Sequence, residues 1–204
     1  MRLRKVIRRT NRLVTSKVPS LKVGRVIACE SRAEKHFVYR LDLDPTVVTF
    51  TEQPAEIQYP VDGVLRRHFP DFLVQRTTGP EFVEVKRAVD AARPEIANRT
   101  AILTAALAAQ AIGYRVVTHE EIEAQPGLGN VRRLIRCRTT PVDPANADAV
   151  VAAVDVSFAM RLGDLVAGGF SRETVLSLVA NGRLWLDIDV TITPETVIKR
   201  RCAQ

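Results

Sequence analysis

The sequence predicts an α/β protein whose main domain is followed by a small helical module, and three observations support this. Short runs rich in valine, phenylalanine and leucine, typical of strands, alternate with amphipathic stretches typical of helices. Two of these runs, at residues 64–75 and 81–87, are separated by Gly79-Pro80, which predicts a hairpin. After a linker at residues 141–146 the composition changes to short helical segments.

The helices of the main domain are expected where capping residues open an amphipathic pattern. Residues 31–34 have the spacing of a capping box, which predicts a helix to about residue 43. An alanine-rich helix is expected over residues 89–111, with Pro94 in its first turn or at a kink. A second capping box at residues 118–121 predicts a short helix. The remaining strands are expected within 21–29 and at 47–50, 57–59 and 114–117.

The carboxy-terminal module is expected to contain three helices and a hairpin-like end. The helices are predicted at residues 147–154, 161–167 and 171–179. An Asn181-Gly182 turn and alternating leucine and isoleucine residues follow them. This order is typical of a winged-helix module, which binds either DNA or a protein partner. The module is not basic enough to decide between the two.

Positive charge is concentrated at the amino terminus, which divides the chain into three predicted regions. The net charge is +7, yet residues 1–29 hold nine lysines and arginines and no acid. Residues 1–20 are therefore interpreted as a basic arm, partly disordered without a partner. Such an arm favours a polyanion, most simply nucleic acid, the alternative being a solvated tail. The main domain is expected at residues 21–140 and the module at 145–204.

Cysteine usage and hydropathy exclude several classes of protein. The three cysteines lie far apart and have no nearby histidines, which argues against a disulfide framework and a zinc site and fits a reducing cytoplasm. No apolar run is long enough to span a bilayer, so no membrane contact is expected. His36, His68 and His119 are not expected to be ligands.

The predicted hairpin brings acids and a lysine together. Asp71 lies on its first strand, and Glu84 and Lys86 point to the same face of its second strand, because side chains alternate along a strand. Such a cluster at a hydrophobic sheet is costly unless a metal or substrate uses it. Carboxylates bind Mg²⁺ through hard oxygen ligands, and the metal can position a phosphodiester and activate water. The alternative is a set of surface charges on an edge hairpin.

Glu34 has two interpretations that the pattern leaves open. As the last residue of the first capping box, it folds back to cap the helix. It also shares a helix face with Phe37, Val38 and Leu41, the stripe expected to face the core. An acid that opens a buried stripe is more than a cap requires.

The order of motifs resembles a known nuclease family. Pro70-Asp71, a hairpin and Glu84-Val85-Lys86 form the PD-(D/E)XK nuclease signature. With Glu30-Ser31-Arg32-Ala33-Glu34, Leu43-Asp44-Pro45 and Glu52-Gln53-Pro54, they occur in the order and spacing of TnsA-like endonuclease subunits of heteromeric transposases. The resemblance covers roughly residues 18–122 and implies a restriction-endonuclease-like core, a mixed sheet flanked by helices.

The resemblance also implies an active site. Carried over residue by residue, it assigns catalysis to Glu34, Asp71, Glu84 and Lys86 and decides the role of Glu34 in favour of function. Glu34, Asp71 and Glu84 would hold Mg²⁺, with Mn²⁺ as a substitute, and Lys86 would orient or deprotonate the attacking water. The family accepts glutamine at the position of Glu84.

The function implied is hydrolysis at the 5′ ends of a mobile element, on the strand not transferred. The implied partners are double-stranded DNA, a DDE-type transposase subunit that cuts the 3′ ends, and an AAA+ ATPase regulator, contacted through the carboxy-terminal module. The implied location is the bacterial cytoplasm, at the nucleoid during activity. Six basic residues are candidates for sequence-independent phosphate contacts: Arg8, Arg9, Arg12, Lys17, Arg132 and Arg133.

Two alternatives are kept. A stand-alone nuclease of restriction, repair or junction-resolving type would cut DNA without partners. A non-catalytic DNA-binding scaffold subunit would carry vestigial carboxylates, and the intact set of three acids and a lysine argues against it.

Overall fold

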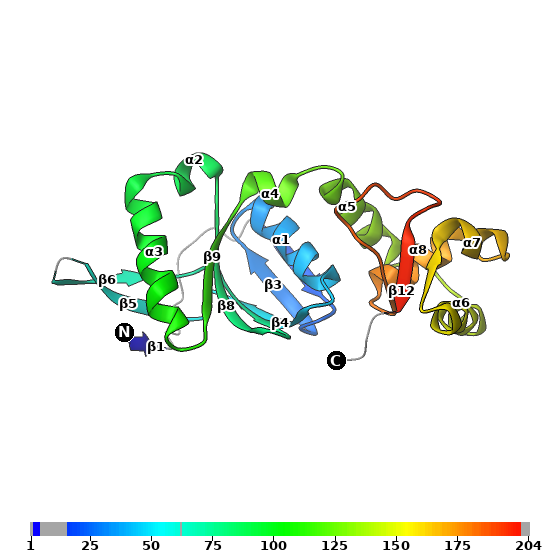
Figure 1. The fold of residues 1–204 in the computed structure, drawn as a ribbon, viewed down its shortest axis with the longest axis horizontal. Coiled ribbons are helices and arrows are strands. Elements are labelled where there is room, and N and C mark those ends of the chain that lie inside the picture. The colour runs from blue at the N-terminus through cyan, green and yellow to red at the C-terminus, as the bar shows by residue number, and fades with distance from the viewer. Residues whose placement is uncertain (1, 5–15, 62, 201–204) are drawn as a thin grey trace. The chain divides into compact units, whose positions relative to one another are not determined.

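The computed structural model describes residues 2–4, 16–61 and 63–200 (Figure 1). Contacts divide the chain into two compact units. The first consists of Met1–Asp42 and Thr46–Ile122, and the second of Leu43–Pro45 and Glu123–Gln204. Among the described residues, no helix is both long and apolar enough to cross a membrane.

The first unit is built on a mixed sheet of four strands in the order β4-β7-β8-β9. The strands are β4 (Val47–Glu52), β7 (Phe72–Arg76), β8 (Gly79–Lys86) and β9 (Gly113–Thr118). Neighbours are antiparallel except β8 and β9, which are parallel. A parallel pair needs a crossover connection, and α2 (Ala88–Ala91) and α3 (Pro94–Ala108) lie within it. The predicted mixed sheet flanked by helices is confirmed.

The predicted hairpin is present, but its first strand is shorter than expected. β7 and β8 pair with Arg76 opposite Gly79, whose φ of 128° suits glycine. The single strand predicted over residues 64–75 is instead two: β6 (Val64–His68) and β7. Pro70 lies between them and cannot donate to a ladder, so the chain leaves one sheet there and enters another. β6 pairs with β5 (Glu56–Val61) in a separate sheet of order β1-β5-β6, with β1 at Arg2–Arg4.

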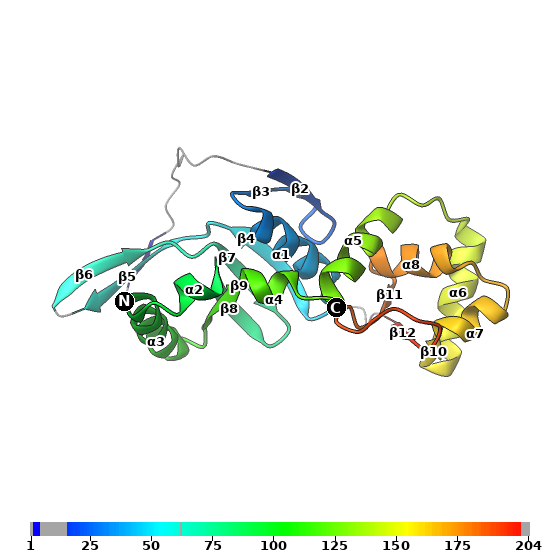
Figure 2. The ribbon, with the colours of Figure 1, turned by 90° about the horizontal axis from the view of Figure 1, so that it is seen from above.

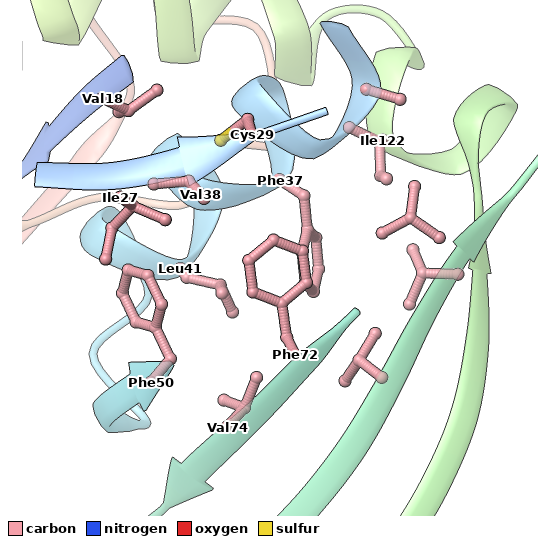
Figure 3. Packing of buried hydrophobic residues seen from close by; sticks show 14 of the residues in the cluster. Val18, Ile27, Cys29, Phe37, Val38, Leu41, Phe50, Phe72, Val74 and Ile122 are labelled. Atoms are coloured by element: carbon pink, nitrogen blue, oxygen red, sulfur yellow. The ribbon is translucent and has the colours of Figure 1, made fainter. Parts of the chain in front are cut away.

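One face of the main sheet packs against α1 (Arg32–Leu43), which begins at the predicted capping box. Figure 3 shows Phe37, Val38 and Leu41 of this helix directed at the sheet. The rings of Phe37 and Phe72 meet edge to face with centroids 5.4 Å apart. The hairpin of β2 (Ser16–Ser20) and β3 (Arg25–Cys29) closes this core.

The other face of the sheet packs against α3, as Figure 2 shows with α1 and α3 on opposite sides. Leu103 and Leu107 of α3 contact Phe82 and Tyr114 of the sheet in a second core. The helix predicted over residues 89–111 is divided into α2 and α3, and Pro94 lies in the first turn of α3, one of its two predicted positions. Its ring removes an N–H that a continuous helix would need there. The second capping box opens α4 (His119–Glu123), as predicted.

The predicted arm differs from the structure at its carboxy-terminal end. Residues 16–20 form β2, whose Val18 is fully buried, so this part belongs to the folded unit. The hydroxyl of Ser20 donates to Asp42 Oδ1 at 2.5 Å, tying β2 to α1. Alternation over only five residues, interrupted by Pro19, is too short to predict a strand. The rest of the predicted arm lies outside the described residues except for 2–4.

The second unit contains the three predicted helices and a small antiparallel sheet. The helices are α6 (Pro144–Ser157), α7 (Leu162–Ala167) and α8 (Arg172–Ala180), the last capped by Ser171. The strands β10 (Ala159–Arg161), β11 (Leu184–Trp185) and β12 (Val197–Arg200) pair in the order β10-β12-β11. α5 (Gly127–Cys137) also belongs to this unit and packs on α8, whereas the predicted boundary lay at residue 140. Its strongly amphipathic pattern accounts for the difference, because Val131 and Leu134 are buried there.

Candidate active site

Asp71 lies immediately before β7 and is held on two sides. Its carboxylate Oδ2 accepts a hydrogen bond of 2.7 Å from the backbone N–H of Val85 on the neighbouring strand. Its backbone carbonyl accepts one of 2.8 Å from the N–H of Gln53. Oδ1 accepts no hydrogen bond from any described residue, so one oxygen is fixed and the other is available.

Burial raises the pKa of Asp71 to about 6. The hydrogen bond from Val85 opposes this rise, the negative charge of Glu34 adds to it, Lys86 opposes it and Glu84 adds to it. The four residues predicted as the active site therefore lie close enough for three of them to act electrostatically on the fourth. A raised pKa on a carboxyl among other acids is typical of sites that bind a cation or move a proton.

Glu84 is almost fully buried on β8, at 3% exposure, and is surrounded by donors. Lys86 Nζ lies 2.7 Å from Oε1, and Arg99 Nη2 donates to both carboxylate oxygens at 2.8 and 2.9 Å. The hydroxyl of Tyr114 donates to Oε2 at 2.7 Å, and His68 Nε2 lies 3.2 Å from the same oxygen. Burial alone would raise the pKa of Glu84, but the hydrogen bonds from His68, Lys86 and Tyr114 outweigh it and hold that pKa well below its usual range.

Three of these partners were not predicted as site residues. His68 comes from β6, Arg99 from α3 and Tyr114 from β9, so three separate elements converge on one carboxylate. Tyr114 Oη and His68 Nε2 lie 2.9 Å apart, which closes the network, and burial raises the pKa of Tyr114. One signal could have identified Arg99: it stands at i−4 and i−8 from Leu103 and Leu107, a lone cation on an apolar stripe.

Glu34 forms the helix cap that the first interpretation predicted. Its Oε2 accepts from the backbone N–H of Glu30 at 2.8 Å, and its Oε1 accepts from the hydroxyl of Ser31 at 2.9 Å. Ser31 Oγ in turn accepts from the N–H of Glu34 at 3.1 Å. The same carboxylate acts on the ionisation of Asp71. Capping and proximity to Asp71 thus coexist, and a catalytic role for Glu34 stays a prediction.

The sequence match to known proteins falls on this part of the chain. Residues 44–119 match the family described as TnsA-like endonuclease, N-terminal. The chain carries a TnsA-like endonuclease domain. The match includes Asp71, Glu84 and Lys86, while Glu34 precedes it. No curated protein matches the chain. A TnsA-like endonuclease domain implies, in general, DNA as its substrate and a transposase as its partner.

Of the predicted metal ligands, Asp71 has an oxygen available for a metal ion, whereas Glu84 is already paired with cations. Within the described ranges, no group of three or more histidine, cysteine, aspartate or glutamate side chains is arranged as a metal site. Asp71 Oδ1 is an available hard oxygen, and its neighbouring acids create a negative potential that a divalent cation would relieve. The carboxylate of Glu84 already contacts Lys86 and Arg99, so a metal there would compete with both cations.

The basic residues predicted to contact DNA are only partly described. Lys17 on β2 is exposed in the unit that contains the TnsA-like domain. Arg132 and Arg133 are exposed on α5 of the second unit. Arg8, Arg9 and Arg12 lie outside the described residues. Exposure is compatible with phosphate contacts, which stay a prediction for all six.

Proposed function

We propose that this protein is a metal-dependent DNA endonuclease subunit of a transposase, hydrolysing the strand not transferred at the 5′ ends of a mobile element. The arrangement of Asp71 is the main support. One of its carboxylate oxygens is fixed by Val85, and the half-buried group lies within electrostatic reach of Glu34, Glu84 and Lys86. A half-buried carboxyl with a raised pKa, with a lysine at the end of the neighbouring strand, suits cation binding and phosphodiester hydrolysis.

The proposed roles follow from what each side chain contacts. Asp71 and Glu84 would hold Mg²⁺ or Mn²⁺, with Glu34 as a further acidic ligand. The metal would supply a polarised phosphoryl oxygen and an acidified water. Lys86, 2.7 Å from Glu84, would orient that water or neutralise developing charge. Arg99 would hold the carboxylate of Glu84 in its orientation.

The partner proposals rest on the resemblance and on the second unit. A DDE-type transposase would cut and join the 3′ ends, and an AAA+ ATPase would regulate the assembly. The second unit runs α6, β10, α7, α8, β11, β12, with β12 central in its sheet. This helix–strand–helix–helix–strand–strand order supports a winged-helix module, which we propose as the contact to the ATPase.

The decisive experiment is strand-specific cleavage of DNA carrying the element's ends, with Mg²⁺, the partner transposase and the ATPase. Asp71→Asn preserves shape and can still accept from Val85, yet it removes the charge. We expect at least about a thousandfold loss of 5′ cleavage with 3′ cleavage unchanged, because a metal ligand is lost. Asp90→Asn is the matched control, since Asp90 is a half-buried carboxylate on α2 that pairs with Arg87. Retention of 5′ cleavage by Asp71→Asn would disprove the assignment.

One observation favours a non-catalytic DNA-binding subunit as a second candidate. Glu84 is ion-paired with both Lys86 and Arg99, as a purely structural carboxylate would be. This candidate requires the wild-type protein to bind the element's ends but never to cut them, with either Mg²⁺ or Mn²⁺ present. Metal-dependent 5′ cuts that Asp71→Asn removes would eliminate it.

A further inference from the structure

The hairpin of β5 and β6 extends beyond the main sheet of the TnsA-like domain (Figures 1 and 2). Val61 pairs with Val64 at the tip of the hairpin, where Gly63 has a φ of 76°. β6 is the outer strand of its sheet, and Val64 to Arg67 are all exposed. An outer strand with exposed apolar and cationic side chains is a surface that a partner can cover.

One of the two faces of β6 ends next to Glu84 of the candidate active site. Side chains alternate along a strand, so Val64, Arg66 and His68 lie on one face and Leu65 and Arg67 on the other. His68 is buried at the base of the hairpin, where its Nε2 lies 3.2 Å from Glu84 Oε2. Arg66 lies two residues from His68 toward the tip, about 7 Å along the strand. The first face therefore runs from the tip of the hairpin to the candidate active site.

The two arginines of β6 also differ in their pairing. Arg67 Nη1 lies 3.6 Å from Glu56 Oε2, so its charge is partly neutralised within the hairpin. Arg66 forms no ion pair with any residue in the described part of the chain. The unpaired cation is thus the one on the face that leads to Glu84. The apolar Val64, 52% exposed, lies further along this same face.

We propose that the β5–β6 hairpin binds the backbone of double-stranded DNA beside the scissile bond, with Arg66 contacting a phosphate. The guanidinium of arginine matches phosphate geometry and stays charged at every relevant pH. A two-stranded ribbon fits the width of a DNA groove. The apolar side chain of Val64 would contact a deoxyribose of the DNA strand whose phosphate Arg66 contacts. This inference rests on the proposed function insofar as DNA is the substrate.

The test compares Arg66→Gln with Arg67→Gln, which removes the same charge one residue away. The full-length proteins would be titrated into a fluorescein-labelled duplex of about 30 base pairs in EDTA, by anisotropy, from about 50 to about 200 mM salt. For Arg66→Gln we expect about tenfold weaker binding and a salt slope reduced by about one phosphate contact. Arg67→Gln should change the affinity by less than about twofold. Arg66→Lys, which keeps the charge, should recover the slope but only part of the affinity.

Several outcomes would overturn the proposal. These are an Arg66→Gln affinity equal to that of the wild type, equal losses in both variants, or no binding of the duplex by the wild type at the lowest salt concentration. Arg66 is exposed, so the variant should unfold at the wild-type temperature, which circular dichroism checks. The cleavage assay separates the two proposals. Loss of 5′ cuts in Asp71→Asn together with wild-type binding by Arg66→Gln would reject only the hairpin. Persistent cuts in Asp71→Asn together with weakened binding by Arg66→Gln would reject only the assignment of the active site.

Discussion

Strand β8 divides its side chains between two environments that contribute different things to the protein. Val83 and Val85 enter the aliphatic core beneath α1. Glu84 and Lys86 face the side of α3, where Arg99 and Tyr114 complete a polar network. The face with Val83 and Val85 is apolar and closely packed. The face with Glu84 holds a buried negative charge, which is stabilised by hydrogen-bond donors from distant elements. Residues one position apart thus contribute to the apolar core on one face and to the candidate active site on the other.

The largest expected effect comes from creating a cavity in the apolar core between the main sheet and α1. Phe72 is fully buried against Phe37, so Phe72→Ala should lower the free energy of unfolding by about 3–5 kcal/mol. Urea unfolding followed by circular dichroism measures this. Phe158→Ala is the control, because Phe158 is 87% exposed and its loss should matter by less than about 0.5 kcal/mol. Equal effects of the two substitutions would contradict the packing described for α1.

A smaller effect is expected on the polar face. Arg99→Gln leaves Glu84 with Lys86 as its remaining strong cation and should cost about 2–3 kcal/mol at pH 7. Arg93→Gln, which loses only an exposed pair with Asp90, should leave stability unchanged. Urea unfolding at pH 7 compares the two variants. A neutral Arg99→Gln would mean that Glu84 is satisfied without α3.

The pH dependence of the Arg99→Gln effect tests its cause. The folded pKa of Glu84 lies below its unfolded value, so its stabilising contribution is present above about pH 4.3, the unfolded pKa of glutamate. That contribution is lost as the pH falls from there toward the folded pKa. The stability difference between wild type and Arg99→Gln should therefore be largest at pH 7 and narrow below pH 4. A difference that stayed constant with pH would assign the loss to packing instead of charge.

The smallest expected effect has the opposite sign. Asp71 has a folded pKa of about 6, above its unfolded value, so its ionised form destabilises the fold above that pH. Asp71→Asn, measured in EDTA, should raise the free energy of unfolding by about 1–2 kcal/mol at pH 8 and leave it unchanged near pH 4. Thermal unfolding at the two pH values measures this. A variant less stable than wild type at pH 8 would show that the carboxylate contributes to folding.

The features that could be predicted from the sequence are those that depend on residues a few positions apart. The capping box at Ser31 and Glu34, and the hairpin that puts Glu84 and Lys86 on one face, follow from spacing within a few residues. Alternation along β8 is sufficient to place the acid and the lysine side by side, because residues two apart in a strand share a face. The role of the pair, in contrast, came from the resemblance and not from spacing.

The features that the sequence does not predict depend on contacts between distant segments. His68 lies 16 residues and Tyr114 30 residues from Glu84, and no local pattern marks them as partners. From the sequence, β2 is interpreted as part of a basic arm, because its five residues form a strand only by pairing with β3 and their own sequence does not show this pairing. Pro70 divides the predicted long strand between two sheets, and the first part pairs with β5, whose Ile57 and Tyr59 pack with α3 in the second core.

The parallel pairing of β8 with β9 has a consequence for how the protein folds. The hairpin of β7 and β8 can form early, since it closes over only a few residues. Arg99 and Tyr114 can reach Glu84 only after the intervening crossover of α2 and α3 has folded back, which closes a much longer loop. Until then Glu84 lacks both donors. We therefore expect the candidate active site to form last, so that a nascent or partly folded chain lacks the hydrogen bonds that orient Glu84.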